Sequence, residues 1–140
     1  MPASDTHAVE PVSKVLIVER DPEFADELAD AFTRAGFAVR RAADGPAALE
    51  EITWQLPHLI VLDLDLPPLP AAGGRLLGAL RRLPITQSVP LLALATLSYR
   101  EAREALQAGA DDCLIKPLPP DEVVAAARDL LARTGVAARQ

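Results

Sequence analysis

Charged or hydroxyl-bearing side chains directly follow four short apolar runs of this sequence. They are Glu19, Arg20 and Asp21 after the first run, Asp63 and Asp65 after the third, Thr96 after the fourth, and Lys116 after the fifth. Carboxylates that face a lysine, with a hydroxyl close by, have the groups needed to capture a phosphoryl group on an aspartate. One carboxylate is then the nucleophile, while a divalent cation, the lysine and the hydroxyl stabilise charge on the transferred group. The residues therefore predict a phosphoryl-accepting site, provided that the fold brings them together.

Five short apolar runs, separated by segments of helical period, carry these residues. The runs are VLIV (15–18), FAV (37–39), LIVL (59–62), LLALA (91–95) and CLI (113–115). Because their apolar residues are continuous rather than alternating, they are typical of parallel strands that are covered on both faces. Every crossover is long enough for the right-handed connection that parallel pairing requires, so we expect a doubly wound α/β sandwich. The carboxyl ends of such strands share one edge, where the functional groove lies.

Capping signals bound the helices that alternate with these runs. Asp21 is a candidate N-cap with Pro22 at the first helical position, and the segment SYRE from Ser98 to Glu101 has the spacing of a capping box. Glycines supply the C-terminal stops. These signals and the apolar period predict helices from Pro22 to a stop at Gly36, over 46–55, over 74–83, from Ser98 to Gly109, and from near Pro120 to Gly135.

Composition limits the class of protein. The chain has 140 residues, half of them hydrophobic, which suits one domain with a full core. A formal net charge of -6 argues against a dedicated binder of nucleic acid or of anionic membranes. The single Cys113 excludes an internal disulfide, and no Cys/His spacing indicates structural zinc. Because neither a bilayer-spanning run nor a secretory signal is present, we expect a cytoplasmic protein. We further expect tails at 1–12 and 135–140 and a domain over 13–134.

Four stretches in this order resemble the receiver domain of bacterial response regulators, over about residues 13–133. They are KVLIVERDPE, PHLIVLDLDLP, VPLLALATLS and AGADDCLIKPL. The resemblance implies a flavodoxin-like fold with strand order 2-1-3-4-5 and phosphorylation of Asp63 by a histidine kinase or a phosphorelay partner. It also implies that Lys116 is the site lysine, that Pro117 is the proline after it, often joined by a cis bond, and that Asp65 lies where the family uses a main-chain carbonyl as a metal ligand.

Arg20 departs from this family's pattern. The family places two acidic residues where this chain has Glu19 and Arg20, and the second of them binds Mg²⁺, which a guanidinium cannot do. In one interpretation Glu19 reaches the metal and weakened Mg²⁺-dependent phosphorylation survives. In a second Asp21 replaces the missing ligand, although helix capping suits it better. In a third Arg20 is a fixed counter-charge over Asp63 that makes the domain a pseudo-receiver. A solvated Arg20 without a role is the remaining alternative.

Two further departures affect the residues that the family uses as a switch. Ala95 occupies the position of the family's hydroxyl residue, and Thr96 is displaced by one, which points its side chain to the other face unless the strand bulges. Cys113 replaces an aromatic residue that the family commonly carries on the fifth strand, so the usual coupling between the two positions is not expected. Cys113 is interpreted as a small buried hydrophobe rather than a redox sensor. The loop LPPLPAAGG is two residues longer than the family's pattern, with Gly73 as the matching glycine.

These features predict a receiver that accepts a phosphoryl group on Asp63 and acts through protein–protein contacts. The alternative is a phosphorylation-independent pseudo-receiver, and a weak alternative is a flavodoxin-like cofactor-binding protein, which the segment ERDPE disfavours because it lacks a phosphate-binding glycine loop. We expect no enzyme activity beyond self-phosphorylation and dephosphorylation of Asp63. His58 starts the strand that ends at Asp63 and so lies too far away to be a base. The expected partners are a histidine kinase or phosphotransfer protein and a downstream protein target that is contacted near Tyr99. A homodimer is also allowed. We expect no direct binding to nucleic acid or to a membrane.

Overall fold

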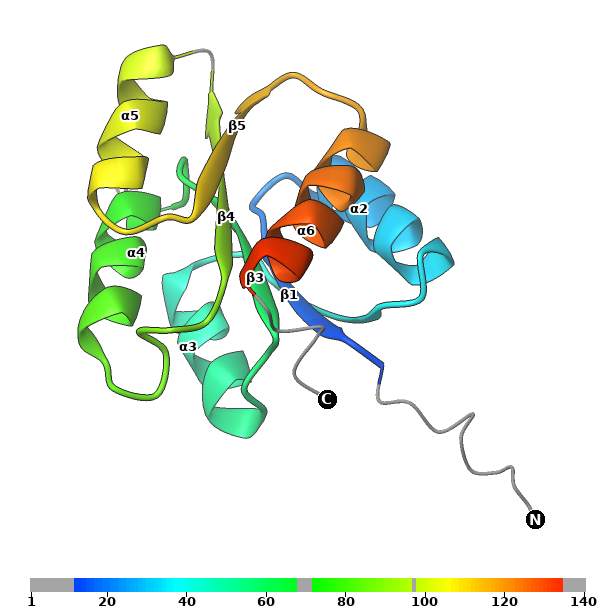
Figure 1. Cartoon of the computed structure of the whole chain (residues 1–140), viewed down its shortest axis with the longest axis horizontal. Helices are drawn as coiled ribbons and strands as arrows, with labels where there is room; N and C mark the ends of the chain where they lie inside the picture. Colours follow the sequence, from blue (N-terminus) through cyan, green and yellow to red (C-terminus); the bar gives the residue numbers. More distant parts are fainter. Residues whose placement is uncertain (1–11, 68–71, 97, 135–140) are drawn as a thin grey trace.

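Strands and helices alternate throughout the part of the chain that the computed structural model describes, residues 12–67, 72–96 and 98–134 (Figure 1). The strands are β1 (Lys14–Val18), β2 (Ala38–Ala42), β3 (Leu59–Asp63), β4 (Leu91–Thr96) and β5 (Asp112–Lys116). The helices are α2 (Pro22–Arg34), α3 (Gly45–Trp54), α4 (Ala72–Arg82), α5 (Tyr99–Gln107) and α6 (Pro120–Thr134). Each predicted strand and helix is present, with bounds that differ from the predictions by a few residues.

The strands form one parallel sheet in the order β2-β1-β3-β4-β5, which confirms the predicted topology. Helices α2 and α6 lie side by side on one face of the sheet, and α3, α4 and α5 cover the other (Figure 1). Because β1 leads to β2 on one side and has β3 on the other, the strand order reverses between β1 and β3. The carboxyl ends of these two neighbouring strands border the crevice where such sheets hold their functional sites.

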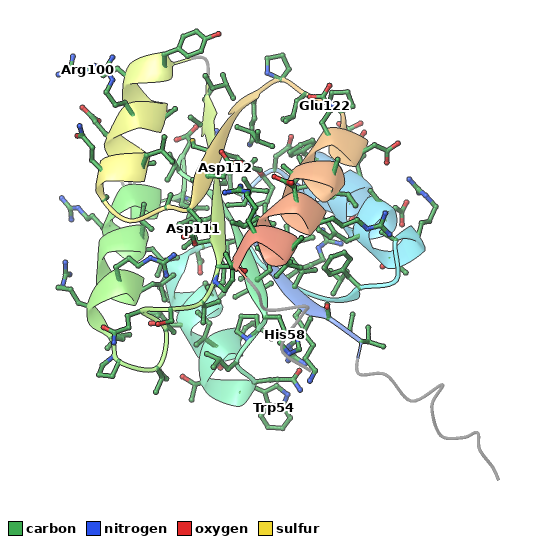
Figure 2. All side chains as sticks on the ribbon, viewed as in Figure 1. Trp54, His58, Arg100, Asp111, Asp112 and Glu122 are labelled. Carbon is green, nitrogen blue, oxygen red and sulfur yellow. The ribbon has the colours of Figure 1, made fainter. Side chains whose placement is uncertain are left out.

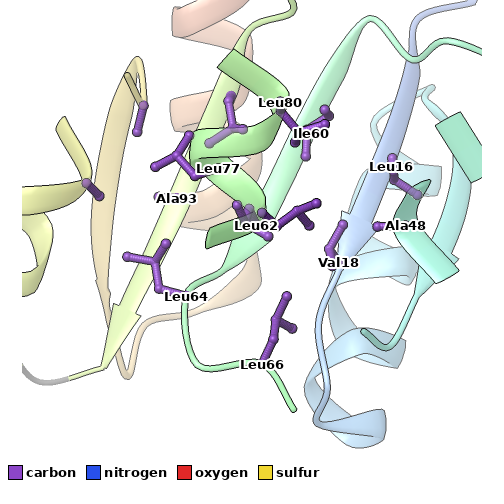
Figure 3. Close-up of a cluster of buried hydrophobic side chains, with 14 of the residues drawn as sticks. Leu16, Val18, Ala48, Ile60, Leu62, Leu64, Leu66, Leu77, Leu80 and Ala93 are labelled. Atoms are coloured by element: carbon purple, nitrogen blue, oxygen red, sulfur yellow. The ribbon is translucent and has the colours of Figure 1, made fainter. Parts of the chain in front are cut away.

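The sheet separates two layers of core. One layer, between the sheet and α3, α4 and α5, contains Leu16, Val18, Ile60 and Leu62 from β1 and β3 (Figure 3). The alternate residues of the same strands face α2 and α6 and are Val15, Ile17, Leu59 and Val61. All eight are buried, so the continuous apolar runs reflect a sheet that is covered on both faces, as predicted. The edge strand β2 is less covered, because Arg40 is half-buried and Arg41 is exposed.

The helix ends follow the capping signals with one exception. The carboxylate of Asp21 accepts a hydrogen bond from the Glu23 amide at 3.2 Å and caps α2, as predicted. The Glu101 amide donates to the Ser98 hydroxyl at 3.1 Å, so Ser98 caps α5. The reciprocal bond of a capping box is replaced, because the Glu101 carboxylate accepts from the Thr96 amide at 3.0 Å. No helix of the described segments is long and apolar enough to cross a membrane.

Candidate functional site

Glu19, Asp63 and Lys116 meet at the carboxyl edge of the sheet. Glu19 directly follows β1, while Asp63 and Lys116 are the last residues of β3 and β5. The Lys116 ammonium Nζ lies 2.8 Å from Glu19 Oε1 and 3.6 Å from Asp63 Oδ1. Both carboxylates are almost fully buried, with exposures of 3% for Glu19 and 0% for Asp63. The fold therefore brings together three residues that are far apart in the sequence, and it places a cation beside two buried anions, as buried charges require.

Backbone amides bind one oxygen of each carboxylate. The Asp65 amide donates to Asp63 Oδ1 at 2.9 Å, and the Asp21 amide donates to Glu19 Oε2 at 3.0 Å. The other oxygen of Glu19, Oε1, accepts no hydrogen bond of good geometry among the described residues but forms the 2.8 Å ion pair with the Lys116 ammonium. Asp63 Oδ2 is buried and has no hydrogen-bond partner among the described residues. A buried oxygen without a hydrogen-bond partner costs free energy of folding, so a purely structural carboxylate would normally have one. The unpaired oxygen therefore marks Asp63 as a group that is prepared to bind or react.

Burial raises the pKa of Glu19 above the usual value for a glutamic acid, and the negative charge of Asp63 acts in the same direction. Lys116 and the Asp21 amide oppose this shift because both favour the ionised form. The ion pair with Lys116 is the interaction expected to keep this buried carboxylate charged at neutral pH.

Phe24 and Pro117 enclose Lys116 on its outer side. The Lys116 ammonium lies 5.2 Å from the centroid of the Phe24 ring, close enough for a cation–π interaction. The peptide bond between Lys116 and Pro117 is cis, as the resemblance implied. An open cleft of about 420 Å³, lined in part by Asp21, Phe24, Lys116 and Pro117, lies beside the lysine. The cleft gives this edge of the sheet access from outside, although Asp63 itself is buried.

Arg20 contacts Asp65 rather than Asp63. Its guanidinium lies 3.4 Å from Asp65 Oδ2, and its side chain is 56% exposed. Among the described residues the cation beside Asp63 is Lys116, so the contacts do not support the interpretation in which Arg20 is a fixed counter-charge over Asp63. Asp21 is occupied as the cap of α2. The pseudo-receiver alternative is thus not favoured by the contacts of Arg20.

Thr96 and Ala95 lie on opposite faces at the end of β4. Ala95 is buried in the core layer under α4 and α5, whereas Thr96 is exposed and pairs in register with Lys116. The register from Leu92 to Thr96 contains no bulge, so the two side chains alternate as predicted. Tyr99 is 83% exposed at the start of α5.

Cys113 is half-buried rather than buried, which corrects the expectation for this residue. Partial burial, together with the negative charges of Glu101 and Asp112, raises the pKa of its thiol to about 11. The thiol therefore stays protonated at neutral pH, which agrees with the interpretation that it is not a redox sensor.

Three contributors to the site were not predicted in these roles. From the sequence, Phe24 was covered only through the helix predicted from Pro22 to Gly36, and Glu101 only as part of a capping box. Gly73 supports the site from α4, because a Cβ atom there would come within 2.5 Å of the Asp63 carbonyl oxygen. The sequence signal for Gly73 was its match to a family glycine. The proline-rich part of the loop, 68–71, lies outside the described residues.

A five-stranded parallel sheet with a buried aspartate and a lysine at its carboxyl edge defines a receiver-type signalling domain. The chain matches the model of the response regulator receiver domain over residues 15–128, and it belongs to that family. It is similar to the transcriptional regulatory protein PrrA of Mycobacterium tuberculosis, with 38% identity over 132 residues, 94% of this chain and 54% of that protein. The chain spans about half the length of the first curated relatives that it matches.

Solved structures share this fold. The receiver domain of the Francisella response regulator 1452 is 32% identical and superimposes with a TM-score of 0.77 over 87% of this chain and 98% of that one. The chemotaxis response regulator CheY4 of Vibrio cholerae is 26% identical, with a TM-score of 0.78 over 86% of this chain and 100% of that one.

Receiver domains bind Mg²⁺ at their acidic pocket, but the donors of this pocket do not fit such an ion. Glu19 has one oxygen on a backbone amide and the other in an ion pair, Asp65 is paired with Arg20, and Arg20 itself replaces an acidic ligand. Across the described segments no group of three or more His, Cys, Asp or Glu side chains has an arrangement that would hold a metal ion. Asp63 Oδ2 is a buried oxygen for which neither a hydrogen bond nor an ion pair is found among the described residues.

Proposed function

We propose that this receiver domain accepts a phosphoryl group on Asp63. The observation that carries the proposal is the Asp63 carboxylate, buried at the carboxyl edge of β3 with Oδ2 free while Oδ1 is held by the Asp65 amide and lies near Lys116. A carboxylate that is oriented through one oxygen presents the other as a nucleophile. From a phosphohistidine donor whose other ring nitrogen carries a proton, Oδ2 forms a bond to phosphorus while the phosphorus–nitrogen bond breaks, and the ring leaves as neutral imidazole.

Lys116 is proposed to stabilise the phosphoryl group. An ammonium has three donors, so Nζ can keep its bond to Glu19 and still bind an oxygen of the incoming group. Phe24 and Glu19 hold Nζ on the side of Asp63, which pre-positions the charge before the donor arrives. Thr96, which shares the register position of Lys116, is proposed as a weaker contributor.

We propose a histidine kinase or phosphotransfer protein as donor and another protein as target. The membership in the response regulator family supports both, and the exposed Tyr99 is a suitable anchor for a target at α5. PrrA is described as a transcriptional regulatory protein, so the expectation of no direct contact with nucleic acid stays a prediction for this chain. The domain limits of 13–134 and a cytoplasmic location also stay predictions.

Intact-mass spectrometry after incubation with acetyl phosphate tests the proposal. We expect the wild type to gain one phosphoryl group and Asp63→Asn to gain none. Asp65→Asn is the matched control, because it alters a neighbouring carboxylate that is not the proposed nucleophile and should still be phosphorylated. A wild-type protein that gains no phosphoryl group in the presence or absence of Mg²⁺, or an Asp63→Asn variant that gains one, would contradict the proposal.

A further inference from the structure

We propose that Arg20 and Lys116 together replace the divalent cation of this site, so that Asp63 takes its phosphoryl group without a metal ion. This inference rests on the proposed function, since it concerns how the same aspartate is phosphorylated. The residues of the pocket do not match the divalent metal ion that the family uses.

The carboxylates of Glu19 and Asp65 are each paired with a cationic side chain. Glu19 lies 2.8 Å from the Lys116 ammonium, and Asp65 lies 3.4 Å from the Arg20 guanidinium. A divalent cation entering this pocket would have to break one of these pairs and would then lie beside a displaced cation. Both costs oppose metal binding, and the second is Coulomb repulsion in a partly buried site, where charges are poorly screened.

Arg20 is placed to change partner when a phosphoryl group arrives. Its contact with Asp65 is a single long ion pair, and with more than half of the side chain exposed such a pair contributes little to stability. The Asp65 amide donates to Asp63 Oδ1, so the guanidinium already contacts a residue that is hydrogen-bonded to the acceptor. A phosphoryl dianion is a stronger partner than a single carboxylate oxygen, because a guanidinium binds phosphate through two parallel hydrogen bonds.

The resulting step is balanced in atoms and charge. With acetyl phosphate as donor, Asp63 Oδ2 forms a bond to phosphorus, the bond from phosphorus to the acetyl oxygen breaks, and acetate leaves with the electron pair. No proton is transferred. Arg20 and Lys116 bind the equatorial oxygens from two sides and supply the positive charge that stabilises the transferred group without a metal ion.

The first test measures metal binding by thermal unfolding, with and without millimolar MgCl₂. We expect the midpoint of the wild type to be insensitive to Mg²⁺. Arg20→Asp restores an acidic residue and should gain a midpoint that rises with Mg²⁺, since a ligand that binds only the folded state stabilises it. Arg103→Asp, which makes the same charge change on an exposed part of α5, should show no Mg²⁺ response. A wild-type midpoint that rises with Mg²⁺ as much as that of Arg20→Asp would overturn the inference.

The second test measures phosphorylation by acetyl phosphate in EDTA or in Mg²⁺, with intact mass as the readout. We expect the wild type to be phosphorylated equally in both, Arg20→Ala to react at least tenfold more slowly in EDTA, and Arg20→Asp to require Mg²⁺. If the wild type is phosphorylated only in Mg²⁺, the inference fails while Asp63 stands as the acceptor. If the wild type is phosphorylated under neither condition, the proposed function fails as well.

Discussion

At the residue scale, His58 shows how a side chain far from the site contributes to the sheet. Its Nδ1 accepts a hydrogen bond from the Lys14 amide at 2.8 Å, and its own amide donates to the Lys14 carbonyl at 2.9 Å. His58 therefore joins the amino ends of β1 and β3, at the end of the molecule near Trp54 (Figure 2). Only a neutral imidazole can accept this bond. Burial, and secondarily the charge of Lys14, lowers the pKa of His58 below its usual 6.5.

Stability should therefore fall in acid through His58. The pKa of the folded state lies below that of the unfolded state, so the contribution of the neutral imidazole is complete above about pH 6.5 and is lost as the pH falls through the folded pKa. We expect the free energy of unfolding, measured with denaturant, to decrease between about pH 7.5 and about pH 5.5. In His58→Asn, whose amide oxygen can accept the same bond without titrating, the decrease should be smaller. An equal decrease in both proteins would show that other groups cause it.

At the scale of elements, the position of Asp63 depends on how closely α4 packs against the end of β3. Gly73 is buried in the first turn of α4, where an added Cβ would come within 2.5 Å of the Asp63 carbonyl oxygen and would also meet the Leu64 backbone. Because these atoms belong to the backbone, they cannot move aside as a flexible side chain could. A Cβ atom added at the next residue, Gly74, would have no neighbouring atom within 4 Å.

Alanine substitutions at the two adjacent glycines should change the free energy of unfolding in opposite directions. We expect Gly73→Ala to lower the free energy of unfolding by about 1–3 kcal/mol, because the helix and the strand must separate. Gly74→Ala should raise it by about 0.5–1 kcal/mol, since alanine has the higher helix propensity and meets no neighbour. Chemical denaturation of both variants measures the difference. Destabilisation of similar size in the two variants would mean that the close approach is not the cause.

At the scale of the whole molecule, Arg81 joins segments that are distant along the chain. From α4 its guanidinium donates to the Gly109 carbonyl at 2.8 Å, to the Val89 carbonyl at 2.9 Å and to the Asp111 carboxylate at 3.0 Å. Asp111, which is labelled in Figure 2 and directly precedes β5, also accepts a hydrogen bond from the amide of Leu91 at the start of β4. One largely buried side chain thus connects the amino ends of β4 and β5 to α4.

Removal of this connection should destabilise the fold as a unit. Arg81→Ala leaves several partly buried acceptors without a donor, so we expect a loss of about 2–4 kcal/mol in the free energy of unfolding. Arg82→Ala removes the same charge from the neighbouring exposed position and should change stability by no more than about 0.5 kcal/mol. Equal losses in the two variants would assign the effect to net charge or helix propensity instead.

Much of this molecule follows from patterns that are local in the sequence. A continuous apolar run predicts a strand that is covered on both faces, and the runs before Glu19, Asp63 and Lys116 are such strands. Parallel strands end at one edge, so the meeting of Asp63 with Lys116 was also predictable. The N-caps Asp21 and Ser98 were recognised because a cap bonds within a few residues of itself.

The choice of side-chain partners depended on the folded chain. Arg20 pairs with Asp65 rather than with Asp63, and Glu101 binds the amide of Thr96 although the amide of Ser98 has the expected spacing. Gly73 is required because of where α4 approaches the Asp63 backbone. The sequence identifies the possible hydrogen-bond donors and acceptors but not the directions in which their side chains point. Several partners of one chemical type lie within reach of a long side chain, and differences of about an ångström, set by the packing of whole elements, determine which pair forms.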